Sequence, residues 1–167
     1  MSQALDPTLR FLGLDFPQLK RSTHQAISWY SWTNQISLPL SAGMMALSKR
    51  DYEGLLRLTV AVCLNQIFLE FLKTVIPEMR PNGTSRSFPS GDTAAAFLGP
   101  AFIVLRYGWD TMSFQISVMT VIAITVAVSR VLTKAHWVHD VVAGAVLGCS
   151  ITYLCVRSFE GKNSGKR

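Results

Sequence analysis

Residues 129–140 read Ser-Arg-Val-Leu-Thr-Lys-Ala-His-Trp-Val-His-Asp and lie between two long apolar runs. The stretch gathers hydroxyls, cations, imidazoles and a carboxylate where an apolar run ends, and polar groups at a bilayer boundary are costly and usually functional. If its end is helical, His136 and Asp140 are at positions i and i+4 on one face. The carboxylate then holds one ring nitrogen and leaves the other free, as in a histidine prepared to act as a nucleophile or base.

Arg130 precedes His136 by six residues. Its guanidinium is a planar fork of donors that can hold an anion against the imidazole. The same residues also allow a plainer interpretation, a salt bridge between Arg130 and Asp140 at a helix end with both imidazoles in solvent. The stretch taken alone leaves both interpretations open.

The composition indicates a membrane protein. The 167 residues are 49% hydrophobic and only 16% charged, with a mean hydropathy of +0.28, which indicates one compact unit rich in apolar runs. The net charge of +6 does not indicate a nucleic-acid partner, because the cations lie between the apolar runs and at the C-terminal end. We interpret them as topology determinants, contacts to anionic lipids and phosphate ligands. The three cysteines predict no disulfide framework, and no cleavable signal peptide is evident.

The apolar runs predict an all-α fold, a polytopic membrane helical bundle of about five transmembrane helices. The predicted spans are residues 27–47, 58–76, 93–105, 112–128 and 138–156. Gly144 and Gly148, in the last span, have the small-xxx-small spacing that lets helices approach closely.

Both ends of the chain differ from this apolar region. Residues 1–26 interleave leucines and phenylalanines with charges and are broken by Pro7 and Pro17. We expect an N-terminal interfacial amphipathic segment there, with a disordered tail as the alternative. The membrane domain is then residues 27–157, and residues 158–167 form a basic flexible tail.

Five spans would place the N-terminus and the connections at residues 77–92 and 129–139 on one side of the membrane. Two polar groups would therefore face each other. Once the cations of these groups are set aside, this side carries fewer lysines and arginines than the other side. We expect the site on the non-cytoplasmic face for that reason.

The connection at residues 77–92 ends with Pro89-Ser90-Gly91-Asp92. Pro-Ser-Gly just before a helix offers a hydroxyl and free backbone N–H groups at the positive end of the helix dipole, which suits an anion. The plainer alternative is an ordinary helix start capped by Ser90 or Asp92.

Cations flank this predicted helix start. Lys73 is followed after six residues by Arg80-Pro81, although a pair between Lys73 and Glu70, one turn apart, is an alternative role for the lysine. With Arg130, these residues would give three cations, a hydroxyl and backbone N–H groups around His136. Such a cluster fits a phosphoryl group in transfer, whose equatorial oxygens carry the charge.

Three motifs in this order resemble the signature motifs of the type 2 phosphatidic acid phosphatase superfamily. They are Lys73-x6-Arg80-Pro81, Pro89-Ser90-Gly91 and Ser129-Arg130-x5-His136-x3-Asp140. That superfamily contains integral-membrane lipid phosphatases and related haloperoxidases built on a helical bundle. The resemblance implies that residues 27–157 are a catalytic membrane domain acting on a lipid phosphate or diphosphate in a bacterial inner membrane, with no cofactor.

The resemblance also implies roles for individual residues. His136 would attack phosphorus and form a phosphohistidine, with Asp140 orienting the imidazole. The residues that would bind the phosphoryl oxygens are Lys73, Arg80, Ser90, Gly91 and Arg130. No metal would be needed.

Two features depart from the family pattern. Members commonly have six spans, whereas about five are predicted here. Asp92 stands where the motif usually reads Pro-Ser-Gly-His, and that histidine would protonate the leaving group. We keep Asp92 as a candidate catalytic residue, although an aspartate, with a reference pKa of about 3.9, is a poor acid at neutral pH. We therefore predict a substrate with a good leaving group, such as a polyprenyl diphosphate or another lipid diphosphate.

Other functions remain as alternatives. A phosphotransferase acting on a second lipid such as lipid A, or a lipid A phosphatase, is closely related. A phosphatase-like protein that has lost its activity and binds lipid headgroups is a different class, and retention of His136 with Asp140 argues against it. A metal site formed by Asp92, His136, His139 and Asp140 is opposed by the nearby cations. A transporter or channel is opposed by the gathering of polar residues at one membrane face.

Overall fold

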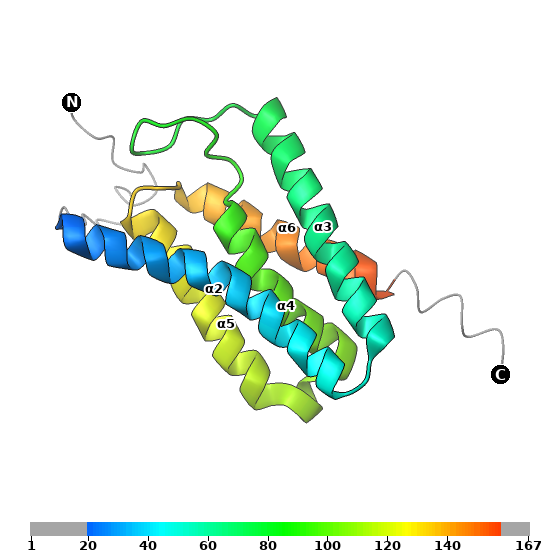
Figure 1. Ribbon diagram of the computed structural model, residues 1–167. Helices are drawn as coiled ribbons and strands as arrows, with labels where there is room; N and C mark the ends of the chain where they lie inside the picture. Colours follow the sequence, from blue (N-terminus) through cyan, green and yellow to red (C-terminus); the bar gives the residue numbers. More distant parts are fainter. Residues whose placement is uncertain (1–19, 158–167) are drawn as a thin grey trace.

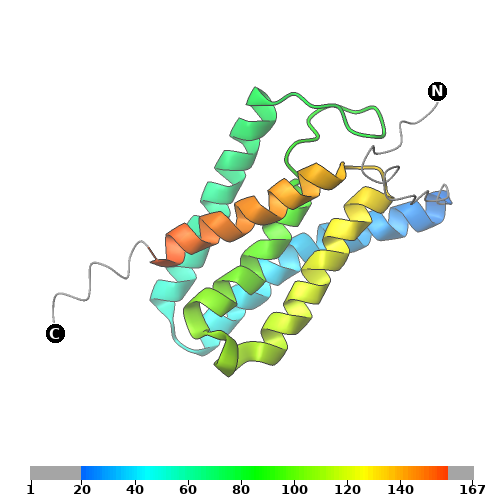
Figure 2. The same cartoon turned by 180° about the vertical axis from the view of Figure 1, so that it is seen from behind.

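Five helices form the part of the chain that the computed structural model describes, residues 20–157. They are α2 (Arg21–Ser48), α3 (Tyr52–Val75), α4 (Gly91–Tyr107), α5 (Trp109–Leu132) and α6 (Val138–Arg157). No strand occurs among residues 20–157, so the predicted all-α fold is confirmed. Figures 1 and 2 show the five helices as one bundle.

Helix α4 is the central element of the bundle. It contacts each of the other four helices, and the two views show it between α2 and α6 (Figures 1 and 2). Its buried side chains include the apolar Ala94, Ala96, Leu98, Phe102 and Ile103 and the small polar Thr93. Small side chains let neighbouring helices approach its backbone, so α4 fixes the positions of the elements around it.

Two glycines bring α6 against α4. A Cβ atom added to Gly144 would overlap the backbone carbonyl oxygen of Ser90, and one added to Gly148 would overlap that of Ala94. The close approach predicted from the spacing of the two glycines is therefore present. As a result, the first turn of α6 lies beside the first turn of α4.

Three of the described helices, α3, α5 and α6, are long and apolar enough to cross a membrane. Helix α4 has only 17 residues, and α2 has 28 residues with Pro39 inside it, and neither meets the same criterion of length and composition. Helix α2 nevertheless presents an exposed apolar stripe of Ile36, Leu40, Met44 and Leu47. That stripe suits a lipid-facing surface, and the crossing of α2 and α4 stays a prediction.

The chain ends need one correction. Helix α2 begins at Arg21, so residues 21–26 belong to this helix and not to a separate surface segment. The rest of the predicted interfacial segment, residues 1–19, and the predicted tail, residues 158–167, lie outside the described residues. The difference arises because a helix can begin before the apolar run that would lie within the bilayer, and α2 begins six residues before it.

The turn between α2 and α3 is tied to the C-terminal end of α4. Asp51 caps α3 by accepting from the Gly54 N–H at 2.9 Å. It also accepts from Arg106 Nε at 2.8 Å, from Arg106 Nη2 at 2.7 Å and from the Tyr107 hydroxyl at 3.1 Å. The hydrogen bonds from the Arg106 guanidinium lower the pKa of Asp51 to about 2. This tie lies at the end of α4 opposite Ser90.

Candidate active site

The two connections that carry the predicted site lie at the same end of the bundle. Figure 1 shows the connection after α3 and the one between α5 and α6 at this end. The Ser90 N–H donates to the Asp140 carbonyl oxygen at 3.0 Å, which joins the start of α4 to the start of α6. His24 Nε2 lies 3.0 Å from the Thr133 carbonyl oxygen, so the start of α2 is at this end too. The predicted facing of the two polar groups is therefore present.

His136 lies in the turn just before α6 and is only 4% exposed. Its Nδ1 atom is 3.5 Å from Asp140 Oδ2, a long distance for a hydrogen bond. The backbone N–H of His136 donates to the Arg130 carbonyl oxygen at 3.2 Å, which fixes the turn against the end of α5. The predicted pairing of the histidine with the carboxylate four residues later is thus present, with Nδ1 as the paired nitrogen.

Asp140 is fully buried and held by two further donors. Its Oδ2 atom accepts from the Ser87 hydroxyl and from the Trp137 N–H, the latter at 2.9 Å. These bonds fix the carboxylate so that it can stabilise a positively charged imidazole without reorienting. Nothing in the spacing of Ser87 identified it as a partner, because the contact depends on how the connection at residues 76–90 folds back onto α6.

Arg130 pairs with Asp92 and not with Asp140. The Arg130 Nη1 atom lies 2.9 Å from Asp92 Oδ2. The plainer interpretation of this stretch, a helix-end salt bridge between Arg130 and Asp140, is therefore wrong. The physical reason is that the end of α5 faces the first turn of α4, whereas Asp140 is enclosed by donors from its own helix start and from Ser87.

Lys73 and Arg80 join the same group. The Lys73 Nζ atom is 3.5 Å from the place of a Cβ atom on Gly91, so this cation lies directly at the start of α4. The charge of Lys73 acts on Arg80 and Asp92, and the charge of Arg130 acts on the same two residues. Two of the cations, Lys73 and Arg130, therefore act on the carboxylate of Asp92, and Arg80 lies near enough for its charge to act on both of them. We call Lys73, Arg80 and Arg130 the cation group.

The charge of Glu70 acts on Lys73, as the alternative role for this lysine implies, but the close ion pair of Glu70 is with another residue. Glu70 forms its ion pair with Arg86 at 2.5 Å, from the connection after α3. Lys73 therefore lies at the start of α4 and within reach of the charge of Glu70.

Ser90 serves as the N-cap of α4. Its side-chain oxygen accepts from the Thr93 N–H at 3.5 Å, and its hydroxyl lies 3.0 Å from that of Thr93. The capping interpretation therefore holds, and it is compatible with anion binding, because the positive end of the α4 dipole still points toward the cation group.

The comparison with known families decides the assignment. The model of the PAP2 superfamily matches residues 54–164. The chain belongs to the PAP2 superfamily. This result confirms the resemblance to type 2 phosphatidic acid phosphatases that the three motifs indicated.

Several curated proteins are similar to this PAP2 protein. A lipid A 4'-phosphatase of Helicobacter pylori is 28% identical over 137 residues, which are 75% of this chain and 67% of that protein. Phosphatidylglycerophosphatase B of Bacillus subtilis is 33% identical over 134 residues, 74% of this chain and 65% of that protein. A lipid A 1-phosphatase of Porphyromonas gingivalis is 38% identical over 71 residues, 42% of this chain and only 16% of that protein.

Two crystal structures share the fold of the PAP2 protein. Aquifex aeolicus LpxE superimposes with a TM-score of 0.70 at 20% identity and covers 89% of this chain and 94% of its own. A transmembrane PAP2-type phosphatidylglycerolphosphate phosphatase from Bacillus subtilis gives 0.65 at 24% identity and covers 89% and 82%. These likenesses confirm an all-α bundle of the PAP2 membrane type.

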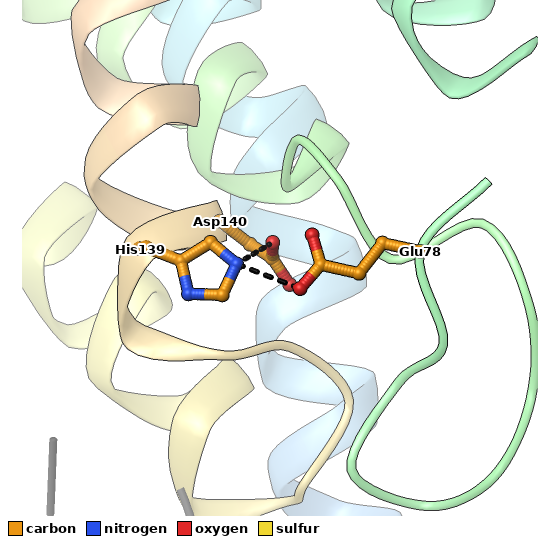
Figure 3. Close-up of side chains that lie close together, drawn as sticks. All are labelled: Glu78, His139 and Asp140. Carbon is orange, nitrogen blue, oxygen red and sulfur yellow. Dashed lines mark hydrogen bonds and ion pairs between the residues drawn. The ribbon is translucent and has the colours of Figure 1, made fainter. Parts of the chain in front are cut away.

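The four residues considered from the sequence as a metal site, Asp92, His136, His139 and Asp140, do not form one group among residues 20–157. Asp92 is paired with Arg130, and His136 does not belong to the group of metal-ligand type found among residues 20–157. That group instead combines His139 and Asp140 with Glu78, a residue that the motifs do not include (Figure 3). Glu78 could not be found from spacing, because it approaches α6 from the connection after α3.

Proposed function

We propose that this PAP2 protein is a membrane lipid phosphatase that works through a phosphohistidine on His136. The observation that carries the proposal is the buried pair of His136 and Asp140 beside the cation group. The family membership and the phosphatases among its relatives support the reaction class. The polar groups lie at one end of a bundle with three helices suited to crossing a membrane, so the substrate is a lipid whose phosphate lies at the membrane surface.

The reaction would proceed in two displacements at phosphorus. His136 Nε2 would attack phosphorus while the bond to the leaving oxygen breaks, and the cation group with the α4 N–H groups would hold the equatorial oxygens. Asp140 would stabilise the positive imidazole through Nδ1, from which Oδ2 is 3.5 Å away. Water would then attack the phosphohistidine, the P–N bond would break, and inorganic phosphate would leave.

The position of Asp92 supports a lipid diphosphate as the substrate. Asp92 is the anionic partner of Arg130 at 2.9 Å, and a carboxylate in that role has no proton for a leaving group. An alkoxide needs such a proton, whereas a phosphate monoester expelled from a diphosphate is already a stable anion. We therefore favour a polyprenyl diphosphate or a similar lipid diphosphate.

Lipid A is the second candidate substrate. It is favoured by the identity of 28% to a lipid A 4'-phosphatase across 75% of this chain. Transfer of the phosphoryl group to another lipid would use the same phosphohistidine, with a hydroxyl in place of water.

Phosphate release from a panel of lipids tests the proposal. The full chain in detergent would be given polyprenyl diphosphate, phosphatidic acid, phosphatidylglycerol phosphate and lipid A. We expect release that depends on His136, with the diphosphate hydrolysed fastest. Strong release from phosphatidic acid with little from the diphosphate would contradict the argument from Asp92. No release from any of the lipids would contradict hydrolysis itself.

A further inference from the structure

A second group of polar side chains lies beside the candidate active site. Glu78, His139 and Asp140 bring one ligand atom each within 4.8 Å of one another. Figure 3 shows one nitrogen of the His139 ring facing both carboxylates, with Glu78 coming from the connection after α3 and the other two from the start of α6. The group differs from the cation group and its carboxylate, Asp92, because none of its three members is among them.

One ring nitrogen faces two carboxylate oxygens in this group. His139 Nε2 lies 2.9 Å from Glu78 Oε1 and 3.2 Å from Asp140 Oδ1. A single N–H bond can point at one of them only, and Asp140 Oδ1 is a buried oxygen without a hydrogen-bond partner among the described residues. A buried carboxylate oxygen without a hydrogen-bond partner destabilises the folded protein, so a partner for it is expected.

A metal ion would satisfy all three ligand atoms. Tetrahedral zinc with ligands at about 2.0–2.2 Å keeps its ligand atoms roughly 3.3–3.6 Å apart. The two distances to His139 Nε2 would grow by a few tenths of an ångström, and the two carboxylate oxygens, which lie within 4.8 Å of each other, would adjust to the same separation. The ion would take the place of the Nε2 proton, which would pass to solvent. One imidazole and two carboxylates with an open fourth position suit a divalent transition metal better than magnesium, which prefers octahedral oxygen ligands.

The charges and the exposure permit such an ion. The side-chain partners of Asp140 are Ser87, Trp137 and the two imidazoles, whereas Lys73 and Arg130 act on Asp92. The side chains of His139 and Glu78 are 54% and 32% exposed, so an ion can reach them from solvent, while that of Asp140 is 0% exposed and closes the inner side.

We propose that Glu78, His139 and Asp140 form a binding site for a divalent transition metal such as Zn²⁺, and that its occupation inhibits the enzyme. Asp140 links this site to the chemistry, because its other oxygen faces Nδ1 of His136 at 3.5 Å. An ion on Oδ1 would draw on the same negative charge that should stabilise the imidazolium. The inhibition rests on the proposed function, whereas the binding does not.

Calorimetric titration of the full chain in detergent with ZnCl₂ tests the binding. We expect one ion per chain, no binding of Mg²⁺, and an affinity for Zn²⁺ that falls about tenfold or more in Glu78→Gln and in His139→Ala. Glu70→Gln is the matched control, since Glu70 is an exposed carboxylate that pairs with Arg86 outside the group, and it should bind as the wild type does. Equal binding by the wild type and the double variant Glu78→Gln/His139→Ala would overturn the site.

Thermal melting without metal shows whether the variants fold like the wild type. The variants should melt as the wild type does, and Zn²⁺ should raise the melting temperature of the wild type but not that of the double variant. If His139→Ala fails to fold, Glu78→Gln, which keeps the shape of the side chain, decides the outcome.

Phosphate release in the presence of Zn²⁺ tests the inhibition. We expect release by the wild type to fall about tenfold and to return with a chelator, while Glu78→Gln and His139→Ala keep their metal-free activity and resist Zn²⁺. Equal inhibition of the wild type and both variants would overturn the inference. Zn²⁺ binding with the expected variant pattern but no release from any lipid would instead contradict the proposed function and support the metal site.

Discussion

At the scale of single residues, His136 and Asp92 have opposite surroundings at the same end of the bundle. His136 is enclosed and faces the carboxylate of Asp140, whereas Asp92 faces the guanidinium of Arg130. The first arrangement is the one that the proposed nucleophile requires. The second pairs one cation with a carboxylate, so under the proposed function the substrate would displace Asp92 from Arg130 or share the guanidinium with it.

His136→Ala should remove the chemistry. We expect kcat to fall at least about a thousandfold, because loss of a nucleophile removes the covalent pathway and leaves only binding and electrostatic effects. The rate of phosphate release at saturating lipid measures kcat. His139→Ala in metal-free buffer is the matched control and should stay within about twofold of the wild type. More than a tenth of the wild-type rate in His136→Ala would contradict the phosphohistidine.

Asp92→His should change the substrate preference. The imidazole would supply the proton that a monoester leaving group needs, so we expect kcat/KM for phosphatidic acid to rise about tenfold relative to that for a lipid diphosphate. Asp92→Asn should keep hydrolysis of the diphosphate within about tenfold of the wild type. Loss of both activities to the same extent in Asp92→Asn would show that the carboxylate is needed for the chemistry itself.

Motif spacing predicted residues that the structure brings to one end of the bundle, but not all of their partners. The pairing of His136 with Asp140 follows from their separation of four residues, and the cations follow from their place beside the α4 start. The partner of Arg130 did not follow, because Asp140 is nearer in sequence and Asp92 becomes its neighbour only when α4 packs against α5. Ser87 and Glu78 come from an irregular connection, where no periodicity indicates a contact.

At the scale of the elements, the contact between α4 and α6 sets the distance between the two halves of the site. The methyl group added by Gly144→Ala would overlap the Ser90 carbonyl oxygen. We expect a loss of about 1–3 kcal/mol of stability together with lower activity, because α6 and His136 must move away from Ser90. Thermal melting and phosphate release measure the two effects.

Val146→Ala is the control for that prediction. Val146 lies on the same helix but is exposed on the outside of the bundle. Its truncation should leave the activity unchanged. Full activity and a normal melting temperature in Gly144→Ala would show that the helices have room to separate there.

Helix positions were predicted more accurately than helix ends. Each of the five predicted spans lies on a helix, because apolar runs mark the parts that lipid or other helices cover. The ends differ where polar residues extend a helix: α5 continues from the predicted end at Val128 to Leu132, through Ser129 and Arg130. At its other end α5 begins at Trp109, and the predicted start, Met112, has a non-helical backbone.

At the scale of the whole molecule, the Asp51 tie should make stability depend on pH. The folded pKa of Asp51 is about 2, below the value of about 3.9 for an unfolded chain. Its contribution is therefore fully present above about pH 4 and is lost as the pH falls through 2. Asp51→Asn should lower the free energy of unfolding at pH 7 by about 1–2 kcal/mol, after allowance for solvent screening, and flatten its slope between about pH 4 and 2.

Unfolding of the detergent-solubilised protein by denaturant at several pH values measures this effect. Asp110→Asn, an exposed acid at the start of α5, is the control and should change neither the free energy of unfolding nor its slope. An unchanged free energy of unfolding in Asp51→Asn at pH 7 would show that the hydrogen bonds from Arg106 contribute nothing net.

The orientation in the membrane is a further prediction for the whole molecule. We expect the site on the non-cytoplasmic face, so in a background without the native cysteines Ser85→Cys should react with an impermeant maleimide added to intact cells. Lys49→Cys, in the turn between α2 and α3, should react only after the cells are opened. The reverse pattern would place the site in the cytoplasm.

The central position of α4 has a consequence for biosynthesis. The α4 helix is short for a membrane span, and its start forms a site only together with His136 and Asp140, which follow it in the chain. Because a chain is made from its N-terminus, the ribosome delivers Ser90 and the cations of α3 well before the nucleophile. If His136 is the nucleophile as proposed, a nascent chain would not attack the lipids around it, and hydrolysis would begin only when α6 has packed against α4 at Gly144.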